Sequence, residues 1–379
     1  MCEIIIAGDL CPKSRTAQLF DESRYSDVFG EVKTVIESAD YALVNLEAPI
    51  VYGNANPINK IGPNLKCNEK VIEAIKFAGF KGVTLANNHF YDYGEEGVLK
   101  TISELENNGI DYLGAGRNLD EAKRTLFKEI NGESFAFINC CEHEFSIATD
   151  TSAGSNPIDV IGQYYAIKDA KLKAQHVIVI VHGGIEMYQL PTPRMVKTYR
   201  FFIEAGADAV INHHQHCFSG YEYYRGKPIS YGLGNFCFDW LGKRQEIWKE
   251  GYMARLTFIQ GKTKIECIPY RQCGEKPAVL LTAIDKINFE TKIKGLCDVI
   301  ADDNKLQAEY QQFLNRTWKN YDMVNPYSNR YLNWLSRKGF LPSMMPSRRL
   351  LSILNAMRCE SHYDRFVYTL MSKIEKRHN

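Results

Sequence analysis

The residues best suited to chemistry in this chain are carboxylates, amides and imidazoles, and each stands at the end of an apolar run. They fall in separate segments, at Asp9, at Asn45 and Glu47, at Asn87-Asn88-His89, at His182, and at His213-His214-Gln215-His216. Carboxylate oxygen, amide oxygen and imidazole nitrogen suit Zn, Mn, Fe or Mg, and no thiolate cage is required. Two such cations sharing a carboxylate can stabilise both oxygens of an in-line displacement. The residue types therefore predict a two-metal hydrolase centre.

The apolar runs that precede these residues have the composition of β-strands. Strands are expected at 3–7, 41–46, 81–86, 134–138, 176–181 and 209–211, with helices at 29–38, 71–78, 94–108 and 193–205 between them. Gly226-Lys227 and Gly261-Lys262 suggest hairpins within an all-β stretch at 228–269. The carboxyl ends of strands in an open α/β sheet line one crevice, so five such ends can build a single site.

Composition limits the function classes. The chain has 379 residues with 45% hydrophobic and 24% charged residues and a net charge of +1, which argues against broad nucleic-acid binding. Asp9 interrupts the first apolar run, so no export signal is predicted. The 11 cysteines form no Cys-x-x-Cys pair and are expected to be reduced thiols. Cytoplasm is the predicted location, with peripheral membrane attachment as an alternative.

Six ordered motifs resemble a known family. They are Gly8-Asp9, Asn45-Leu46-Glu47, and the segments 86–94, 182–186, 206–216 and 226–236. Together, over about Met1 to Asp239, they look like the capsule-synthesis protein A family, which is linked to poly-γ-glutamate and capsule synthesis and resembles the calcineurin-like metallophosphoesterases. The resemblance implies an α/β fold, a metallophosphoesterase-like four-layer α/β/β/α sandwich over residues 1–285. Residues 286–379 would form a C-terminal helical extension.

The resemblance also implies a role for each matching residue. Two divalent ions (Mn, Zn, Fe or Mg) would be held by Asp9, Glu47, Asn88, His182, His214 and His216, with Glu47 where the superfamily places a bridging aspartate. His89 would be the general acid over the leaving group, oriented by Asp92. Further members of the site are expected among Cys11, Asn45, Asn87, His213, Glu186 and Asn235.

Two positions depart from the superfamily pattern. Cys11 stands where a histidine usually follows the first aspartate, and a thiolate there could bind zinc or iron. Phe90 occupies the place of the acid that usually follows the catalytic histidine. These departures favour an alternative in which the chain retains a degenerate metal site without turnover.

Each signal also has a structural interpretation. Asp9 alone is more often a turn residue, and Asn87-Asn88-His89 could cap the start of a helix. Glu186 is equally well a solvated loop acid, and Asn235 is nearly as well a turn residue. The segment Cys140-Cys141-Glu142-His143 only superficially resembles a metal patch, because adjacent cysteines on a strand point to opposite faces. It is expected to belong to the core.

The C-terminal part is expected to be helical at 292–301, 305–321, 328–338 and 347–376, with a break near Cys359–His362. Its basic residues (Arg337, Lys338, Arg348, Arg349, Arg358, Arg365) interleave with apolar ones. The favoured interpretation is packing on the main domain with a solvated basic face. The alternative is docking on an anionic membrane or a protein partner.

The leading function hypothesis is metal-dependent hydrolysis of a phosphoester or related bond in bacterial capsule, poly-γ-glutamate or exopolymer metabolism. The expected substrate is an anionic small molecule or polymer, and no nucleic acid. A non-catalytic accessory role in polymer synthesis or export is the main alternative. A third hypothesis is hydrolysis of an amide or peptide bond to γ-linked glutamate, because the same activated water attacks carbonyl groups.

Overall fold

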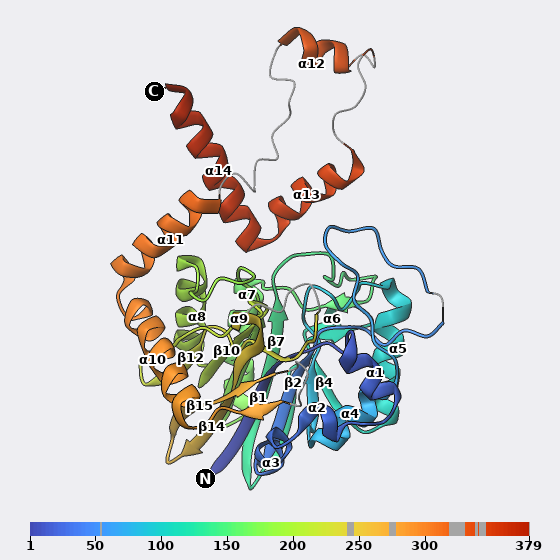
Figure 1. The fold of residues 1–379 in the computed structure, drawn as a ribbon, viewed down its shortest axis with the longest axis vertical. Coiled ribbons are helices and arrows are strands. Elements are labelled where there is room, and N and C mark those ends of the chain that lie inside the picture. The colour runs from blue at the N-terminus through green and yellow to red at the C-terminus, as the bar shows by residue number, and fades with distance from the viewer. Residues whose placement is uncertain are drawn as a thin grey trace.

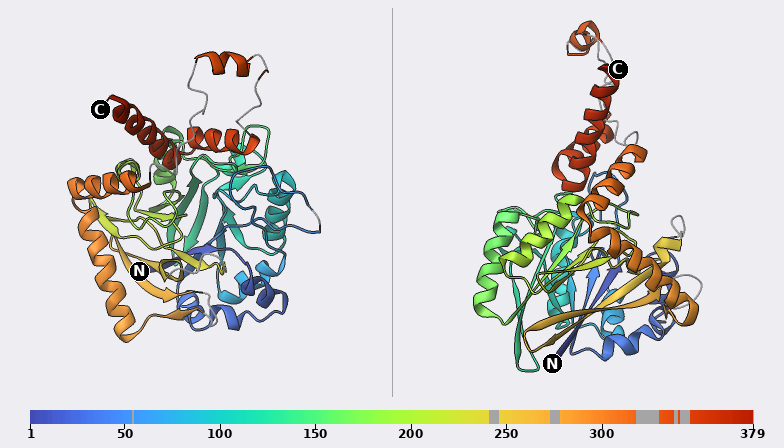
Figure 2. Two further views of the ribbon diagram at one scale, coloured as in Figure 1. Left: turned by 45° about the horizontal axis from the view of Figure 1, so that its top comes forward. Right: turned by 90° about the vertical axis from the view of Figure 1, so that its left-hand side faces the viewer.

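The computed structural model describes residues 1–53, 55–240, 246–272, 278–317, 330–337, 340 and 346–378. Within this part of the chain, two large sheets lie face to face, with helices on their outer faces (Figure 1). The predicted α/β sandwich of four layers is confirmed. The described residues also include C-terminal helices: those at 347–378 lie at one end of the sandwich, whereas the helix at 283–300 runs along its side (Figure 2).

The two sheets are mixed, with parallel strands at their centres. The first has the order β16 (Val279–Leu280), β15 (Lys262–Arg271), β14 (Glu250–Ile259), β1 (Cys2–Leu10), β2 (Tyr41–Leu46), β3 (Gly82–Thr84) and β4 (Asp111–Leu113), with β13 (Asn235–Cys237) also paired to β1. The second has the order β11 (Tyr221–Tyr224), β12 (Lys227–Ser230), β10 (Ala209–His213), β9 (His176–His182), β7 (Glu133–Cys141) and β6 (Leu126–Ile130). A small sheet joins β5 (Ala115–Gly116) to β8 (Gly154–Ser155).

Helices cover both outer faces. The first sheet is covered by α1 (Arg15–Asp21), α2 (Ser26–Phe29), α3 (Val32–Glu37), α4 (Lys70–Ala78) and α5 (Gly94–Asn107). The second is covered by α7 (Val160–Lys173) and α8 (Pro193–Ala205). The short helices α6 (Leu119–Ala122) and α9 (Glu246–Lys249) lie in connections. The C-terminal helices are α10 (Ala283–Ile300), α11 (Asp303–Thr317), α12 (Arg330–Arg337), α13 (Ser347–Arg358) and α14 (Glu360–His378).

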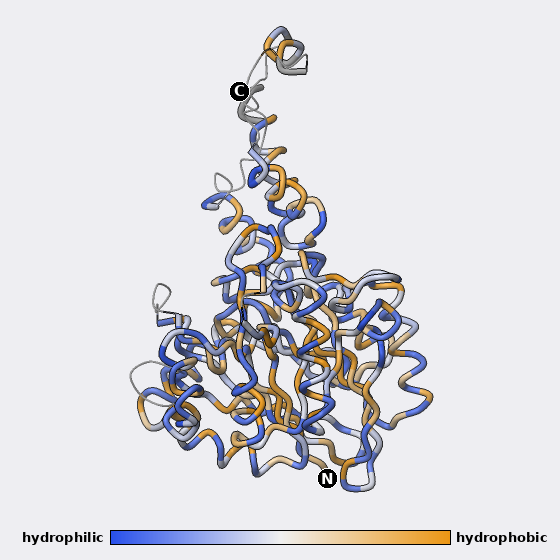
Figure 3. The backbone as a smooth tube through the Cα atoms, turned by 90° about the vertical axis from the view of Figure 1, so that its right-hand side faces the viewer, coloured by the Kyte–Doolittle hydropathy of each residue, from blue (hydrophilic) through white to orange (hydrophobic). Residues whose placement is uncertain are grey.

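Strand β9 illustrates how the sequence produces the layers. Successive side chains of a strand point to opposite faces of the sheet. Ile178 and Ile180 therefore pack between the two sheets, whereas Val177, Val179 and Val181 pack against α7 and α8. Burying each such side chain stabilises the fold by about 1.5–3 kcal/mol. The hydropathy colouring shows the same arrangement, with hydrophobic segments gathered in the interior (Figure 3).

The expected strands and both hairpins are confirmed, with small shifts of their ends. Gly226 and Gly261 have φ angles of +75° and +74° in the turns that join β11 to β12 and β14 to β15. The stretch expected to be all-β also contains the short helix α9, and helix α7 was not predicted. The pattern of α7 is weak because only Gln163, Ile167 and Ala170 of that helix are buried.

The C-terminal helices differ from the prediction mainly at their start. Helix α10 begins at Ala283 instead of 292, because Phe289 and Ile293 pack into the core between the sheets. The proposed domain boundary at 285/286 therefore falls inside α10 and stays a prediction. The break expected near Cys359–His362 is confirmed by the end of α13 at Arg358 and the start of α14 at Glu360. Residues 318–329 and 338, which include parts of two predicted helices, lie outside the described residues.

The long axis of the molecule runs from the N-terminus to the C-terminal helices. Strand β1 begins near the bottom in Figure 1, and its carboxyl end points toward α13 and α14. Among the described residues, no helix has the length and apolar character needed to cross a bilayer. Attachment to a membrane surface or a protein partner through the C-terminal helices stays a prediction.

Candidate metal centre

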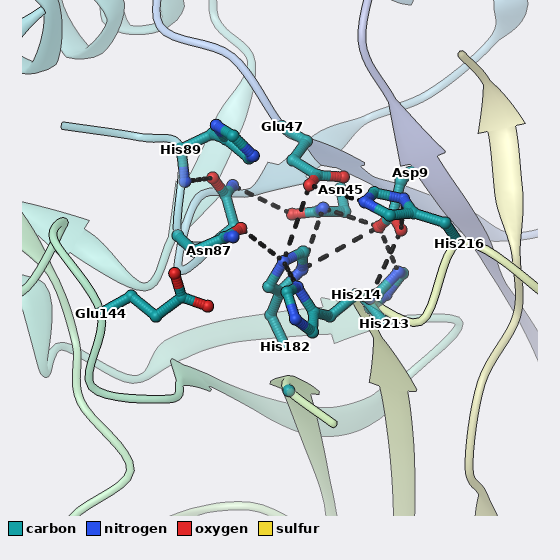
Figure 4. A network of polar contacts seen from close by, with 12 residues as sticks. Asp9, Asn45, Glu47, Asn87, His89, Glu144, His182, His213, His214 and His216 are labelled. Carbon is teal, nitrogen blue, oxygen red and sulfur yellow. Dashed lines mark hydrogen bonds and ion pairs between the residues drawn. The ribbon is translucent and has the colours of Figure 1, made fainter. Parts of the chain in front are cut away.

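The predicted ligands meet at the seam between the two sheets, where β1 and β2 of one sheet end beside β9 and β10 of the other. Two groups of buried side chains each place their ligand atoms within 4.8 Å of one another. The first group is Asp9, Glu47 and His216, and the second is Glu47, His182 and His214. Glu47 belongs to both groups, as a bridging carboxylate would. Figure 4 shows these five side chains turned toward one another.

The first group is organised around the ring of His216. Its Nδ1 lies 3.6 Å from Oδ2 of Asp9, and its Nε2 lies 3.7 Å from Oε1 of Glu47. The same Nδ1 lies 3.0 Å from Oδ1 of Asn235, which fits an Nδ1–H that donates to the amide oxygen. Such an orienting contact fixes the tautomer and leaves Nε2 as the ligand atom.

The second group converges on Nε2 of His182. This atom lies 3.1 Å from Oδ1 of Asn88, 3.1 Å from Nδ1 of His214, and 3.8 Å from Oε1 of Glu47. Burial and the neighbouring His214 lower the pKa of His182 well below its usual value. The imidazole is therefore neutral at physiological pH, which is the form that binds metal.

The donor set fits a pair of divalent cations. Both carboxylate oxygens of Glu47 are buried and have no hydrogen-bond partner. Burial raises the pKa of Glu47 well above its usual value, and the charges of Asp9 and Glu186 add to that shift. A buried carboxylate without hydrogen bonds is costly unless a positive charge compensates it. Cations bound by the two groups would supply that charge on both sides of Glu47.

The backbone is strained where the histidines project into the site. His214 and His216 have φ angles of 90° and 54°, which residues other than glycine seldom adopt. Conformations of this kind cost about 1–3 kcal/mol each and cluster at functional sites. Position 8 requires glycine for a steric reason, because a Cβ there would lie 1.9 Å from the carbonyl oxygen of Gly234. This close approach sets Asp9 beside Asn235 in the pairing of β1 with β13.

Two asparagines hold the ligands in position. Asn45 donates through Nδ2 to Oδ1 of Asp9 at 2.8 Å, and its own Oδ1 accepts from Nδ2 of Asn87 at 3.3 Å. Asn87 in turn accepts from the backbone N–H of His89 at 3.1 Å. Both residues were predicted only as further members of the site. Their contacts link the first metal group to the segment that carries His89.

The structure brings His89 and Asp92 together as expected. Nδ1 of His89 lies 2.7 Å from Oδ2 of Asp92, so the aspartate three residues later supplies the acid that Phe90 does not. Lys60 was not predicted; it forms an ion pair with Asp92, and its Nζ lies 3.1 Å from Nδ1 of His89. Burial and the charge of Lys60 lower the pKa of His89 to about 4. The neutral ring is therefore the favoured form near neutral pH.

The remaining predicted residues occupy different places. Nδ1 of His213 lies 3.2 Å from Oδ1 of Asp9. Glu186 lines a pocket that opens beside the metal centre. Cys11 belongs to the hydrophobic core on the outer face of the first sheet, and neither ligand group includes it. Burial and the nearby charge of Glu47 raise the pKa of its thiol well above the usual value.

A pocket of about 300 Å³ opens beside the centre. Asn88, His89 and His214 line its floor, and Glu144 and Glu186 line its walls. Its other wall comes from the C-terminal helices, through Asn355, Ser361, His362 and Arg365. Arg365, one of the basic residues of the C-terminal helices, lines this pocket. No apolar periodicity marks these residues or Glu144, which is why they were missed.

The sandwich and the paired ligand groups at its seam define a metallophosphoesterase-like fold. Residues 3–240 match the family described as "Bacterial capsule synthesis protein PGA_cap", and the chain belongs to this family. The "Capsule biosynthesis protein CapA" of Bacillus anthracis is 28% identical over 291 residues, covering 74% of this chain and 70% of that protein. The "PGA biosynthesis protein CapA" of Bacillus subtilis is 30% identical over 236 residues. That alignment covers 61% of this chain and 62% of the relative, which is less than two thirds of its length.

Two solved structures are similar at low identity. The 5'-nucleotidase precursor of Thermus thermophilus has a TM-score of 0.43 and 12% identity, covering 78% of this chain and 58% of that chain. The 5'-nucleotidase of Candida albicans has a TM-score of 0.40 and 10% identity, covering 90% of this chain and 64% of that chain.

Proposed function

We propose that this chain is a dinuclear-metal hydrolase that cleaves a phosphoester in the metabolism of a capsule, poly-γ-glutamate or a related exopolymer. The observation that carries the proposal is the shared carboxylate of Glu47, which belongs to two ligand groups and has no hydrogen-bond partner. The printed names of the Bacillus relatives, capsule biosynthesis and PGA biosynthesis, supply the biological setting.

Each residue of the site has a task in this proposal. Asp9, Glu47 and His216 would hold one cation, and Glu47, Asn88, His182 and His214 the other. A pair of divalent cations supplies Lewis acidity, which activates a water molecule and stabilises the charge of the transition state. Asn45 and Asn235 orient the ligands Asp9 and His216.

His89 would deliver a proton to the leaving oxygen. If Nδ1–H donates to Asp92, Nε2 is left for the substrate. Bound phosphate would favour the protonated ring by its negative charge, opposing the effect of burial. The acid form is therefore expected with the substrate in place.

An anionic substrate is favoured by the basic side chains that line the pocket. Lys60 and Arg365 line the pocket. The acids Glu144 and Glu186 lie on the same lining and would disfavour a substrate with negative charge along its whole length. A phosphoester with its charge at the metal end and hydroxyl or amino groups elsewhere suits this distribution.

The test is an assay of purified protein that is stripped of metal and reloaded with Mn²⁺ or Zn²⁺. We expect hydrolysis of an aryl phosphate or a bis-aryl phosphodiester, and loss of that activity in Glu47→Gln. The control is Glu222→Gln. Glu222 lies on the edge strand β11, away from the site, and its carboxylate pairs with Arg200 of α8. Failure to cleave any of these esters with several metals would reject the proposal.

A second candidate is an accessory protein that binds a ligand without turnover. It is favoured by Cys11, whose buried thiol replaces the histidine of the superfamily pattern. Two relatives from Mycobacterium tuberculosis, 28% identical over 237 residues, are named "Probable polyglutamine synthesis accessory protein". Metal analysis separates the two, because an accessory role predicts fewer than two metal ions at the seam. A γ-glutamyl anilide, included in the same assay, tests the amide-hydrolase alternative.

A further inference from the structure

A second cluster of potential metal ligands lies where the C-terminal helices meet the core. The loop after β7 contacts the start of α14 through several polar pairs. Nδ1 of His143 lies 2.6 Å from Oε1 of Glu360, and Ser361 donates to Oε1 of Glu142 at 2.7 Å. These contacts join residues more than two hundred positions apart in the chain.

Three different ligand types converge in this cluster. A carboxylate oxygen of Glu144, the sulfur of Cys359 and a ring nitrogen of His362 all lie within 4.8 Å of one another. Oε1 of Glu144 and Nε2 of His362 are 4.0 Å apart. Cys359 immediately precedes α14 and His362 lies in its first turn, so the Cys-x-x-His spacing places both on one side of the helix.

The surroundings of Cys359 favour a cation. Its thiol is 0% exposed and lies 3.4 Å from Oε2 of Glu142, which is itself buried. The half-buried carboxylate of Glu144 belongs to the cluster, whereas that of Glu360 is paired with His143. Buried carboxylates cost free energy unless they are paired or coordinate a metal. Sulfur, imidazole and carboxylate together are ligands of zinc.

We propose that Glu144, Cys359 and His362 bind a zinc ion that fastens α14 to the loop after β7. This site is separate from the two groups that share Glu47, and it contains the thiolate ligand that those groups lack. Glu144 and His362 also line the pocket. Three protein ligands leave a fourth position for water or for a ligand in the pocket. The ion would therefore hold the C-terminal wall of the pocket in place.

Cobalt substitution tests the site by a signal that the seam ligands cannot produce. The full-length protein is stripped of metal and titrated with Co²⁺, and thiolate-to-cobalt charge-transfer absorption is recorded. We expect this absorption in the wild type and in Cys11→Ser, and its loss in Cys359→Ser. Metal analysis of the zinc-loaded protein should show one ion fewer per chain in Cys359→Ser.

Matched variants keep the result unambiguous. Cys2→Ser is the control, because Cys2 is as buried as Cys359 and lies at the start of β1, the end that is farther from the metal centre. His362→Gln should also lose the absorption, and it provides a second reading if Cys359→Ser fails to fold. No thiolate absorption in the wild type, its persistence in Cys359→Ser, or its persistence in His362→Gln where Cys359→Ser does not fold, would overturn the proposal. Phosphoesterase activity that depends on Glu47 can persist in either case, so the two proposals fail independently.

Discussion

Asp92 holds the ring of His89 through a direct contact, with Oδ2 of the aspartate 2.7 Å from Nδ1 of the imidazole. A histidine held in this way keeps one tautomer and one orientation. If His89 protonates the leaving oxygen, its contribution depends on how poor the leaving group is.

We predict that His89→Asn lowers kcat by about 10²–10⁴ for an alkyl phosphate, a range typical of general acid catalysis. The loss should be much smaller for a nitrophenyl phosphate, whose leaving oxygen needs no proton. Metal content should stay unchanged. Equal losses for both substrates would contradict the assigned role.

Lys60 and Asp92 form a buried ion pair, with side chains that are 2% and 0% exposed. Removing one partner of such a pair leaves an uncompensated buried charge, which typically costs about 3–5 kcal/mol. We therefore predict that Lys60→Met lowers the free energy of unfolding by that amount in urea titrations. The control is Lys66→Met in the same loop. Lys66 is exposed, so its replacement should change stability by less than about 0.5 kcal/mol.

His176 and His182 stand at opposite ends of β9, and only His182 reaches the seam. We predict that His182→Ala binds one metal ion fewer per chain than the wild type at the seam, by metal analysis after dialysis. His176 pairs with Glu133 at 2.7 Å and packs on Phe135, so His176→Ala should lose stability but keep its metal content. Equal metal content in both variants would show that His182 is not a ligand.

Asp208 should make stability depend on pH. Burial raises the pKa of its carboxyl, but hydrogen bonds from Lys171 and Lys227 outweigh burial and hold the pKa below the usual value. The unfolded chain therefore takes up the proton first. The stabilisation is present above about pH 4 and is lost as the pH falls through the folded-state pKa.

We predict that Asp208→Asn costs about 1.5–3 kcal/mol near neutral pH, the usual contribution of hydrogen bonds to a charged group. The difference from the wild type should shrink below about pH 4 in urea titrations. Asp169 is exposed on the same helix as Lys171, and Asp169→Asn serves as the control. A difference that is constant across this pH range would contradict the assignment.

The metal ligands on the floor of the site could be predicted from the sequence because each of them follows a predicted strand. Asp9, Glu47 and His182 each follow a run whose apolar character marks a buried strand, and parallel strands bring their carboxyl ends together. Asn88 and His214 were predicted as ligands for the same reason. A pattern of this kind predicts where a side chain emerges from a sheet, and that is all the metal groups require.

The wall of the pocket could not be predicted in this way. His362 and Arg365 reach the pocket only because α14 docks on a loop more than two hundred residues earlier in the chain. Lys60 lies in a connection without periodicity, so nothing in the sequence indicated its pairing with Asp92. Glu142 was expected in the core beside Cys141, and its contact with Cys359 depends on the same docking.

The most direct test of the two-metal centre is anomalous diffraction at the metal edge from crystals of protein loaded with Mn²⁺ or Zn²⁺. Two peaks should flank the carboxylate of Glu47, one beside Asp9 and His216 and the other beside His182 and His214. The absence of a peak within coordination distance of Glu47, or a single peak there at full metal loading, would contradict the dinuclear centre.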